Sequence, residues 1–228
     1  MNTDGYKLGQ TEFSELMYKT EKEAGAQVGA SSQTPVGIQT GLGVKVGASS
    51  KIFEQGPLRH TGNQLDLAIE GRGFIPVQRP NGEIAYTRVG AFHRDSQGRM
   101  VLSNGCQLVP NVVLPANALG IAIKPNGEIT ASMPDASENT IGQIQLVSFV
   151  NEQGLTATGE GLYKPTLASG APIQGIPGEN GMGQLGQGEL EGSNVNGANL
   201  MAERIQTQRA YEMGTKVMGI ADRVLDDA

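Results

Sequence analysis

The stretch FIPVQRPNGEIAYTR, residues 74–88, places Asn81-Gly82 between two apolar arms. An Asn-Gly pair readily adopts the positive φ angles of a type I′ turn, whose twist matches that of two antiparallel strands. The stretch therefore predicts a β-hairpin. Two more hairpin signals follow it: FHRDSQGRMVLS turns at 95–98, and IAIKPNGEITASM turns at Asn126-Gly127. The pentapeptide PNGEI, at 80–84 and again at 125–129, is one turn used twice and is too short to indicate a duplicated domain.

Strand signals continue on both sides of these hairpins. GVKVGASSKIFEQG (43–56) alternates, LDLAIEGRGFIPVQ (65–78) contains a mostly apolar run, and IGQIQLVSFV (141–150) predicts a further strand. Residues 151–192 are rich in Gly and Gln, which suits short strands and turns. The chain has 33 glycines in 228 residues without a short repeat, so turns and not a collagen helix account for them. We expect a mainly β fold.

The C-terminal stretch AYEMGTKVMGIADRVL, residues 210–225, has helical spacing instead. One apolar stripe contains Met213, Val217, Ile220 and Val224, and a neighbouring stripe contains Tyr211, Met218, Ala221 and Leu225. The polar half carries Glu212, Lys216, Asp222, Arg223 and Asp226. A helix from about Val195 to Leu225 would be about 46 Å long, with Ser193, Asn194 or Asn196 as its N-cap.

This helix needs packing, because Gly197, Gly214 and Gly219 each weaken it by about 1 kcal/mol relative to Ala. It could cover a sheet of its own domain. Its apolar face, however, is wide and long for that contact, and no other segment of the chain is a helical partner of similar length. We therefore expect a partner from another molecule.

The N-terminal region is less regular. Residues 10–20, QTEFSELMYKT, predict either a short helix or an extended arm. Residues 21–40 are small and polar, so they predict a flexible loop or a segment that becomes ordered only against a neighbouring molecule.

Composition argues against several classes of function. The net charge is −6 without a basic patch, which disfavours nucleic-acid binding. No apolar run reaches the roughly 18 residues of a membrane span, and the N-terminus lacks the apolar core of a secretory signal. The single Cys106, within an apolar strand, is expected to be a buried structural thiol.

No set of residues predicts catalysis, a metal or a cofactor. His60 and His93 stand 33 residues apart with no Cys or His beside either. Asp66 and Glu70 would share a strand face but lack a partner for acid–base work. GLGVKVG (41–47) lacks the strand and helix of a phosphate loop, and no nucleophilic serine lies in a Gly-x-Ser-x-Gly elbow.

Three motifs, in order along the chain, resemble those of the bacterial flagellar rod and hook protein family. SNVNGANLMAERIQTQRAYEMGTKVMGIADRVL (193–225) is similar to the family's C-terminal signature, an SNV turn leading into a helix that contains QRAYE. NTDGYK (2–7) resembles the end of its N-terminal motif, and residues 65–110 resemble its middle β domain. The motif residues are Asn2, Gly5, Tyr6, Lys7, Ser193, Asn194, Val195, Gln208, Arg209, Ala210, Tyr211 and Glu212.

The resemblance implies a Gly-rich β domain of hairpins with a long C-terminal helix that packs with helices of other subunits. It implies an N-terminal arm and extended loop at 1–40, a β domain at 41–192 and an assembly helix at 193–228. Residues 12–46 look like the distal-rod type of subunit, in which this segment is thought to stiffen the rod through contacts between neighbours. The implied interface consists of Ile205, Tyr211, Met213, Val217, Met218, Ile220, Ala221, Val224 and Leu225.

The function implied is mechanical: subunits stack helically into a hollow shaft that transmits torque and passes exported subunits. The implied partners are further copies of the chain, proximal rod and hook subunits, and the outer ring proteins around the rod. The implied location is the rod crossing the periplasm, reached without a cleaved signal. Family members begin with a further helix that pairs with the C-terminal one, so we expect this chain either to be shortened or to have its start assigned too late.

Three alternatives remain. A proximal rod or hook subunit would assemble in the same way at a different position along the shaft. A secreted β-rich binding module would use the terminal helix as an oligomerisation tag. An enzyme acting on peptidoglycan is the third, although no acid pair supports it.

Overall fold

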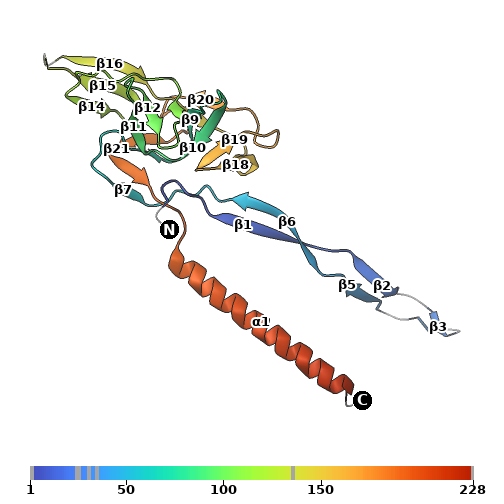
Figure 1. Cartoon of the computed structure of the whole chain (residues 1–228). Coiled ribbons are helices and arrows are strands. Elements are labelled where there is room, and N and C mark those ends of the chain that lie inside the picture. Colours follow the sequence, from blue (N-terminus) through green and yellow to red (C-terminus); the bar gives the residue numbers. More distant parts are fainter. Residues whose placement is uncertain (1–2, 24–26, 30–31, 34–35, 135–136, 227–228) are drawn as a thin grey trace. The chain divides into compact units, whose positions relative to one another are not determined.

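The computed structural model describes residues 3–23, 27–29, 32–33, 36–134 and 137–226. The chain divides into two compact units (Figure 1). The first, which we call the body, comprises the residues up to Lys7 and those from Glu54 onward, and the second, the ribbon, comprises Leu8–Phe53. The fold is mainly β, as the sequence predicts.

The largest sheet of the body has seven antiparallel strands in the order β11-β12-β13-β9-β10-β19-β18. The hairpin predicted around Asn81-Gly82 lies in this sheet, with Ala85 opposite Val77 and Thr87 opposite Ile75. In chain order the strands are β9 (Ile75–Gln78), β10 (Ile84–Thr87), β11 (Phe92–Arg94), β12 (Met100–Leu102), β13 (Gln107–Leu108), β18 (Thr156–Gly159) and β19 (Leu162–Lys164).

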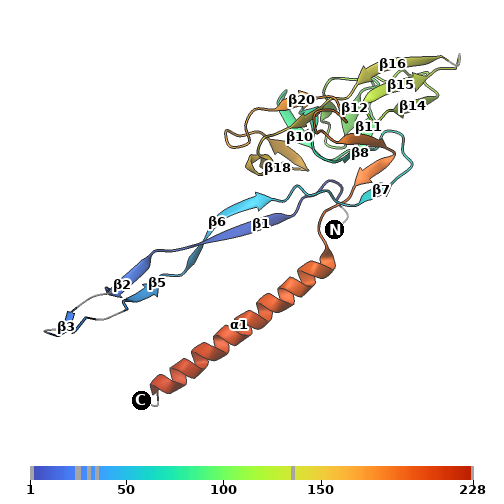
Figure 2. The same cartoon turned by 180° about the vertical axis from the view of Figure 1, so that it is seen from behind.

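Smaller sheets complete the body. A three-stranded antiparallel sheet, β14-β15-β16, contains the second Asn-Gly hairpin, and Figure 2 shows it at one end of the body, away from β18. Three antiparallel pairs, β17-β20, β21-β8 and β22-β7, bring distant segments together. The bounds are β7 (Leu58–His60), β8 (Leu67–Glu70), β14 (Gly120–Ile123), β15 (Glu128–Ser132), β16 (Glu138–Gln143), β17 (Leu146–Ser148), the 3-10 helix η1 (Glu152–Gly154), β20 (Ile173–Gly175), β21 (Gln184–Gln187) and β22 (Glu189–Glu191).

One hydrophobic core holds these sheets together. Apolar side chains from the large sheet, from β8 and from β17 meet there, including the fully buried Leu67, Ile75, Phe92 and Leu146. Burying each such side chain contributes about 1.5–3 kcal/mol. The short strands thus depend on a shared core for their stability.

The hairpin loops close in a way that differs from the predicted type I′ turn. At the first, the Gly82 N–H donates to Arg79 O at 2.9 Å and the Arg79 N–H donates to Glu83 O at 2.8 Å. Only Gly82 is left-handed, with φ +86°. Pro80 holds a negative φ at the first turn position, which favours a type I turn followed by a left-handed glycine. The same bonds and left-handed glycine recur at 95–99, 102–106 and 124–128.

Two details of the strand prediction are wrong. Residues 141–150 form the end of β16 and all of β17, in different sheets, because the intervening Ile144 is fully buried and donates its N–H to Gly127 O in the neighbouring turn. Cys106 is buried, as expected, but lies in the turn before β13. Burial raises the pKa of its thiol, which makes it less reactive.

The ribbon is a two-stranded antiparallel structure. β1 pairs with β6, placing Phe13 opposite Val46, and β2 pairs with β5, placing Tyr18 opposite Gly41. The alternative of an extended arm for residues 10–20 is therefore correct, and that of a helix is wrong. The bounds are β1 (Gly9–Glu15), β2 (Tyr18–Lys22), β3 (Gln27–Gly29), β4 (Ser32–Gln33), β5 (Ile38–Gly41) and β6 (Val44–Lys51).

The structure of residues 21–40 differs from the flexible loop that the sequence predicts. Their described part contributes to four strands and is not an irregular loop, while 24–26, 30–31 and 34–35 lie outside the described residues. The expected boundary between residues 40 and 41 falls inside β5. Because β6 returns along β1, the ribbon ends at Phe53 and the body resumes at Glu54.

Candidate assembly helix and its attachment

The C-terminal helix α1 spans Gly197–Asp226, close to the predicted range. Asn196 is its N-cap, since its Oδ1 accepts hydrogen bonds from the N–H groups of Ala198 at 3.0 Å and Asn199 at 3.4 Å. The other two cap candidates act elsewhere. Ser193 Oγ accepts from the Val195 N–H at 3.2 Å, and Asn194 Nδ2 donates to Glu54 O at 3.3 Å.

The apolar face of α1 is uncovered. Every residue from Met201 to Ile220 is exposed, and Tyr211 retains 74% of its accessible surface. The other predicted interface residues with described side chains are also exposed: Ile205, Met213, Val217, Met218 and Ile220. The side chains of Ala221, Val224 and Leu225 lie outside the described part of the chain. Large apolar side chains exposed along a helix are typical of an interaction surface.

The motif residues occupy two places. Gln208, Arg209, Ala210, Tyr211 and Glu212 lie on exposed turns of α1. Gly5, Tyr6 and Lys7 run beside the strand that leads into α1, and Asn2 lies outside the described residues. Gly5 has φ +66°, and a Cβ there would lie 2.9 Å from Val89 N, so the motif requires glycine.

A cluster of buried charges joins Lys7 to the strand that precedes α1. Lys7, Arg88 and Glu191 each retain 2% of their surface or less, and Lys7 Nζ lies 2.5 Å from Glu191 Oε1. Arg88 Nη1 lies 3.4 Å from Glu191 Oε2, and the guanidinium stands 5.4 Å from the centre of the Phe74 ring. Burial lowers the pKa of Lys7, and its hydrogen bond to Glu191 opposes that shift. The sequence motif includes Lys7, but no sequence signal pointed to Arg88 or Glu191.

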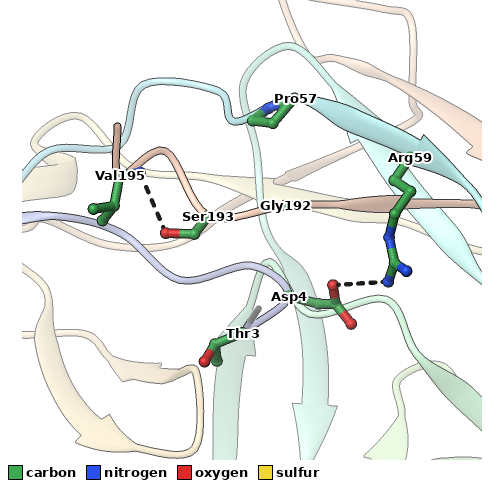
Figure 3. A pocket seen from close by; sticks show the side chains of 7 residues that line it. All are labelled: Thr3, Asp4, Pro57, Arg59, Gly192, Ser193 and Val195. Carbon is green, nitrogen blue, oxygen red and sulfur yellow. Dashed lines mark hydrogen bonds and ion pairs between the residues drawn. The ribbon is translucent and has the colours of Figure 1, made fainter. Parts of the chain in front are cut away.

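A cavity of about 510 Å³ lies next to this attachment (Figure 3). Its two charged lining residues face each other, with Arg59 Nη2 3.4 Å from Asp4 Oδ1. The lining residues are Thr3, Asp4, Pro57, Arg59, Gly192, Ser193 and Val195. Because its charged groups already pair with each other, the cavity presents no convergent charge to a ligand.

The residues that the sequence analysis considered as candidates for catalysis or metal binding do not form a common site. Asp66 accepts hydrogen bonds from Thr61 Oγ1 at 2.6 Å and Asn63 Nδ2 at 2.9 Å, which makes it a loop-closing residue. His93 Nε2 lies 3.2 Å from Ser103 Oγ. In the described ranges no three His, Cys, Asp or Glu side chains gather as a metal site. Within those ranges, too, no helix combines the length and apolar character that crossing a bilayer requires.

A mainly β chain whose long terminal helix leaves large apolar side chains exposed belongs to the class of proteins that associate through such a helix. Comparison with family models makes this specific. Residues 68–131 match the flagellar hook protein FlgE/F/G D1 domain, and residues 187–228 match the C-terminal region of the flagellar basal body rod FlgEFG proteins. The chain belongs to the flagellar rod and hook protein family. The family is structural, so the chain is not an enzyme.

Relatives match over nearly the whole chain. The flagellar basal-body rod protein FlgG of Caulobacter vibrioides is 42% identical over 99% of this chain and 87% of its own length. That of Buchnera aphidicola subsp. Schizaphis graminum is 41% identical over the same shares. A hook protein, FlgE of Rhizobium meliloti, is 29% identical over 74% of this chain and 43% of its own length.

Proposed function

We propose that the chain is a subunit of the distal rod of the bacterial flagellum, and that α1 is the element through which copies assemble. The observation that carries this proposal is the exposure of the large apolar side chains of α1 between Ile205 and Ile220. Exposed apolar side chains gain free energy when a neighbouring molecule covers them, at about 25 cal/mol per Å². A long helix of this kind packs best against other helices.

The arrangement supports a tubular assembly. The α1 helices of successive copies would form an inner layer around a channel, and the β sheets would form the outer wall. The rod relatives match more of the chain, and at higher identity, than the hook relative does, which favours a rod subunit over a hook subunit. Proximal rod and hook subunits, and outer ring proteins around the rod, are the proposed partners, in a rod that crosses the periplasm after export without a cleaved signal.

The assembly face can be tested with neighbouring substitutions. Val217→Asp places a charge on the exposed apolar stripe, whereas Lys216→Asp places the same side chain on the polar half of the helix. Burying an unpaired carboxylate costs several kcal/mol, so we expect Val217→Asp to prevent assembly and Lys216→Asp to permit it. Rods in isolated basal bodies and swimming of a strain that lacks its own rod gene are the measurements.

The purified variants supply the control. Both side chains are exposed in the single chain, so the thermal unfolding of the body should be the same in both variants and in the wild type. Rods and swimming at the wild-type level with Val217→Asp would overturn the proposed face.

A further inference from the structure

The Glu191 carboxylate is the meeting point of four chain segments. It has no exposed surface, and its Oε1 accepts from Lys7 Nζ at 2.5 Å and from the Gly56 N–H at 3.0 Å. Its Oε2 accepts from Arg88 Nη1 at 3.4 Å. Lys7 immediately precedes the ribbon, Gly56 follows it, Arg88 follows β10, and Glu191 ends β22 before α1.

Backbone bonds join the same segments. The Gly5 N–H donates to Glu191 O at 2.7 Å, and the Asn194 N–H donates to Tyr6 O at 3.4 Å. Lys7 Nζ also donates to Glu54 O, at 2.7 Å. Residues 3–7, Glu54 and the leader of α1 are therefore fastened to one another.

Two buried cations share the Glu191 carboxylate, and Arg88 Nε has no hydrogen-bond partner among the described residues. Desolvation makes such a cluster a poor source of stability, whereas its fixed geometry specifies one arrangement of the segments it joins. When Lys7 is removed, the Glu191 carboxylate still has Arg88 as an ion-pair partner.

We propose that Glu191 is a clamp that holds the segments of this junction in one fixed arrangement, so that force can pass between them. Its two oxygens fasten the N-terminal segment at Lys7, the backbone at Gly56 and the Arg88 side chain to the leader of α1. Force applied to α1 then passes to the β sheets through Glu191 and its partners and not through a flexible linker. Because the clamp lies within a single chain, it can be tested without assembly, independently of the proposed function.

The first variant is Lys7→Met, which keeps the length of the apolar stem and removes the ammonium group. The residue-resolved readout is amide hydrogen exchange of the purified full chain. We expect the Gly5 and Asn194 amides to exchange at least tenfold faster, while strands β9 and β10 stay as in the wild type. Lys164→Met is the matched control, since it removes an exposed ammonium that pairs with Glu83 on the same body and should change neither amide.

The second variant, Glu191→Gln, should accelerate the Gly56 amide as well and expose the Lys7–Leu8 bond to trypsin, which the burial of Lys7 blocks in the wild type. Wild-type exchange at Gly5, Gly56 and Asn194 in both variants would overturn the clamp and assign the junction to its backbone bonds. Uniformly faster exchange throughout β9 and β10 in Lys7→Met would also overturn it, because the cluster would then act on global stability. Should Glu191→Gln fail to fold, Lys7→Met decides.

Discussion

Tyr163 is a buried side chain of the body that carries a polar hydroxyl group. Only 4% of its surface is exposed, and its ring meets that of Phe74 edge to face at 5.9 Å. Phe149 joins the same aromatic group, 5.8 Å from Phe74 and 4.9 Å from Tyr86. Burial raises the pKa of the Tyr163 hydroxyl to about 12, so the phenol remains neutral in the folded chain at pH values where an exposed tyrosine ionises.

This pKa predicts a loss of stability in alkali. The folded pKa lies above the unfolded value of 10.0, so the contribution of Tyr163 is complete below pH 10 and is lost as the pH rises through about 12. The difference between these two pKa values corresponds to about 2.7 kcal/mol. Urea unfolding of the wild type should show this loss between those pH values, and Tyr163→Phe should reduce it. The exposed Tyr211→Phe should not, and equal alkaline profiles for all three proteins would contradict the assignment.

Residue-scale contacts are also where sequence reasoning failed. Lys7 belongs to a motif, yet its partner Glu191 lies 184 residues away, and no periodicity links the two. An ion pair of this kind depends on how β22 and the N-terminal segment are placed, which local propensity does not determine. The hairpin turns at 79–83, 95–99, 102–106 and 124–128, in contrast, depend only on residues that are close in the sequence. Three were predicted, and the fourth, at Asn104-Gly105, carries the same Asn-Gly signal.

At the scale of elements, the local sequence was sufficient to predict α1 but not the ribbon. Amphipathic spacing and a cap residue predicted α1 within a few residues. The described residues of the ribbon bury no face of their own: Phe13 and Val46 remain 67% and 61% exposed. A segment without a buried face lacks the alternation that identifies a strand, so residues 10–40 could not be assigned from the sequence. Their strands are held by cross-strand hydrogen bonding instead.

The exposure of α1 predicts its dynamics. In the monomer, helical hydrogen bonds without tertiary cover should open often, so amides from Met201 to Ile220 should exchange at least a hundredfold faster than those of β9 and β10. Replacing both Gly214 and Gly219 by Ala should slow that exchange, since an added Cβ meets nothing within 4 Å and each change favours the helix by about 1 kcal/mol. Strong protection of wild-type α1 in a proven monomer would show that the helix already has a partner.

At the scale of the whole molecule, the two units allow folding and stiffness to be separated. The body contains the whole hydrophobic core cluster, from Leu65 to Leu185. The ribbon adds a paired extension that contributes none of those residues. A change confined to the ribbon should therefore leave the body folded and alter only what the ribbon does in an assembly, which we propose is to stiffen the rod by contacting neighbouring copies.

Deleting residues 21–40 tests this role. Tyr18 already pairs with Gly41, so the deletion leaves Lys19 and Thr20 as a two-residue loop, and Lys19→Asn with Thr20→Gly gives that loop a favourable hairpin sequence. We expect an unchanged unfolding transition of the body, rods that still assemble, and a bending stiffness at least twofold lower, measured from the curvature of isolated rods in electron micrographs. A version with 21–40 replaced by a Gly-Ser segment of equal length should be equally flexible, because it restores length without cross-strand pairing. Rods as stiff as the wild type in both cases would refute the stiffening role while leaving assembly through α1 intact, since no residue of that helix is altered.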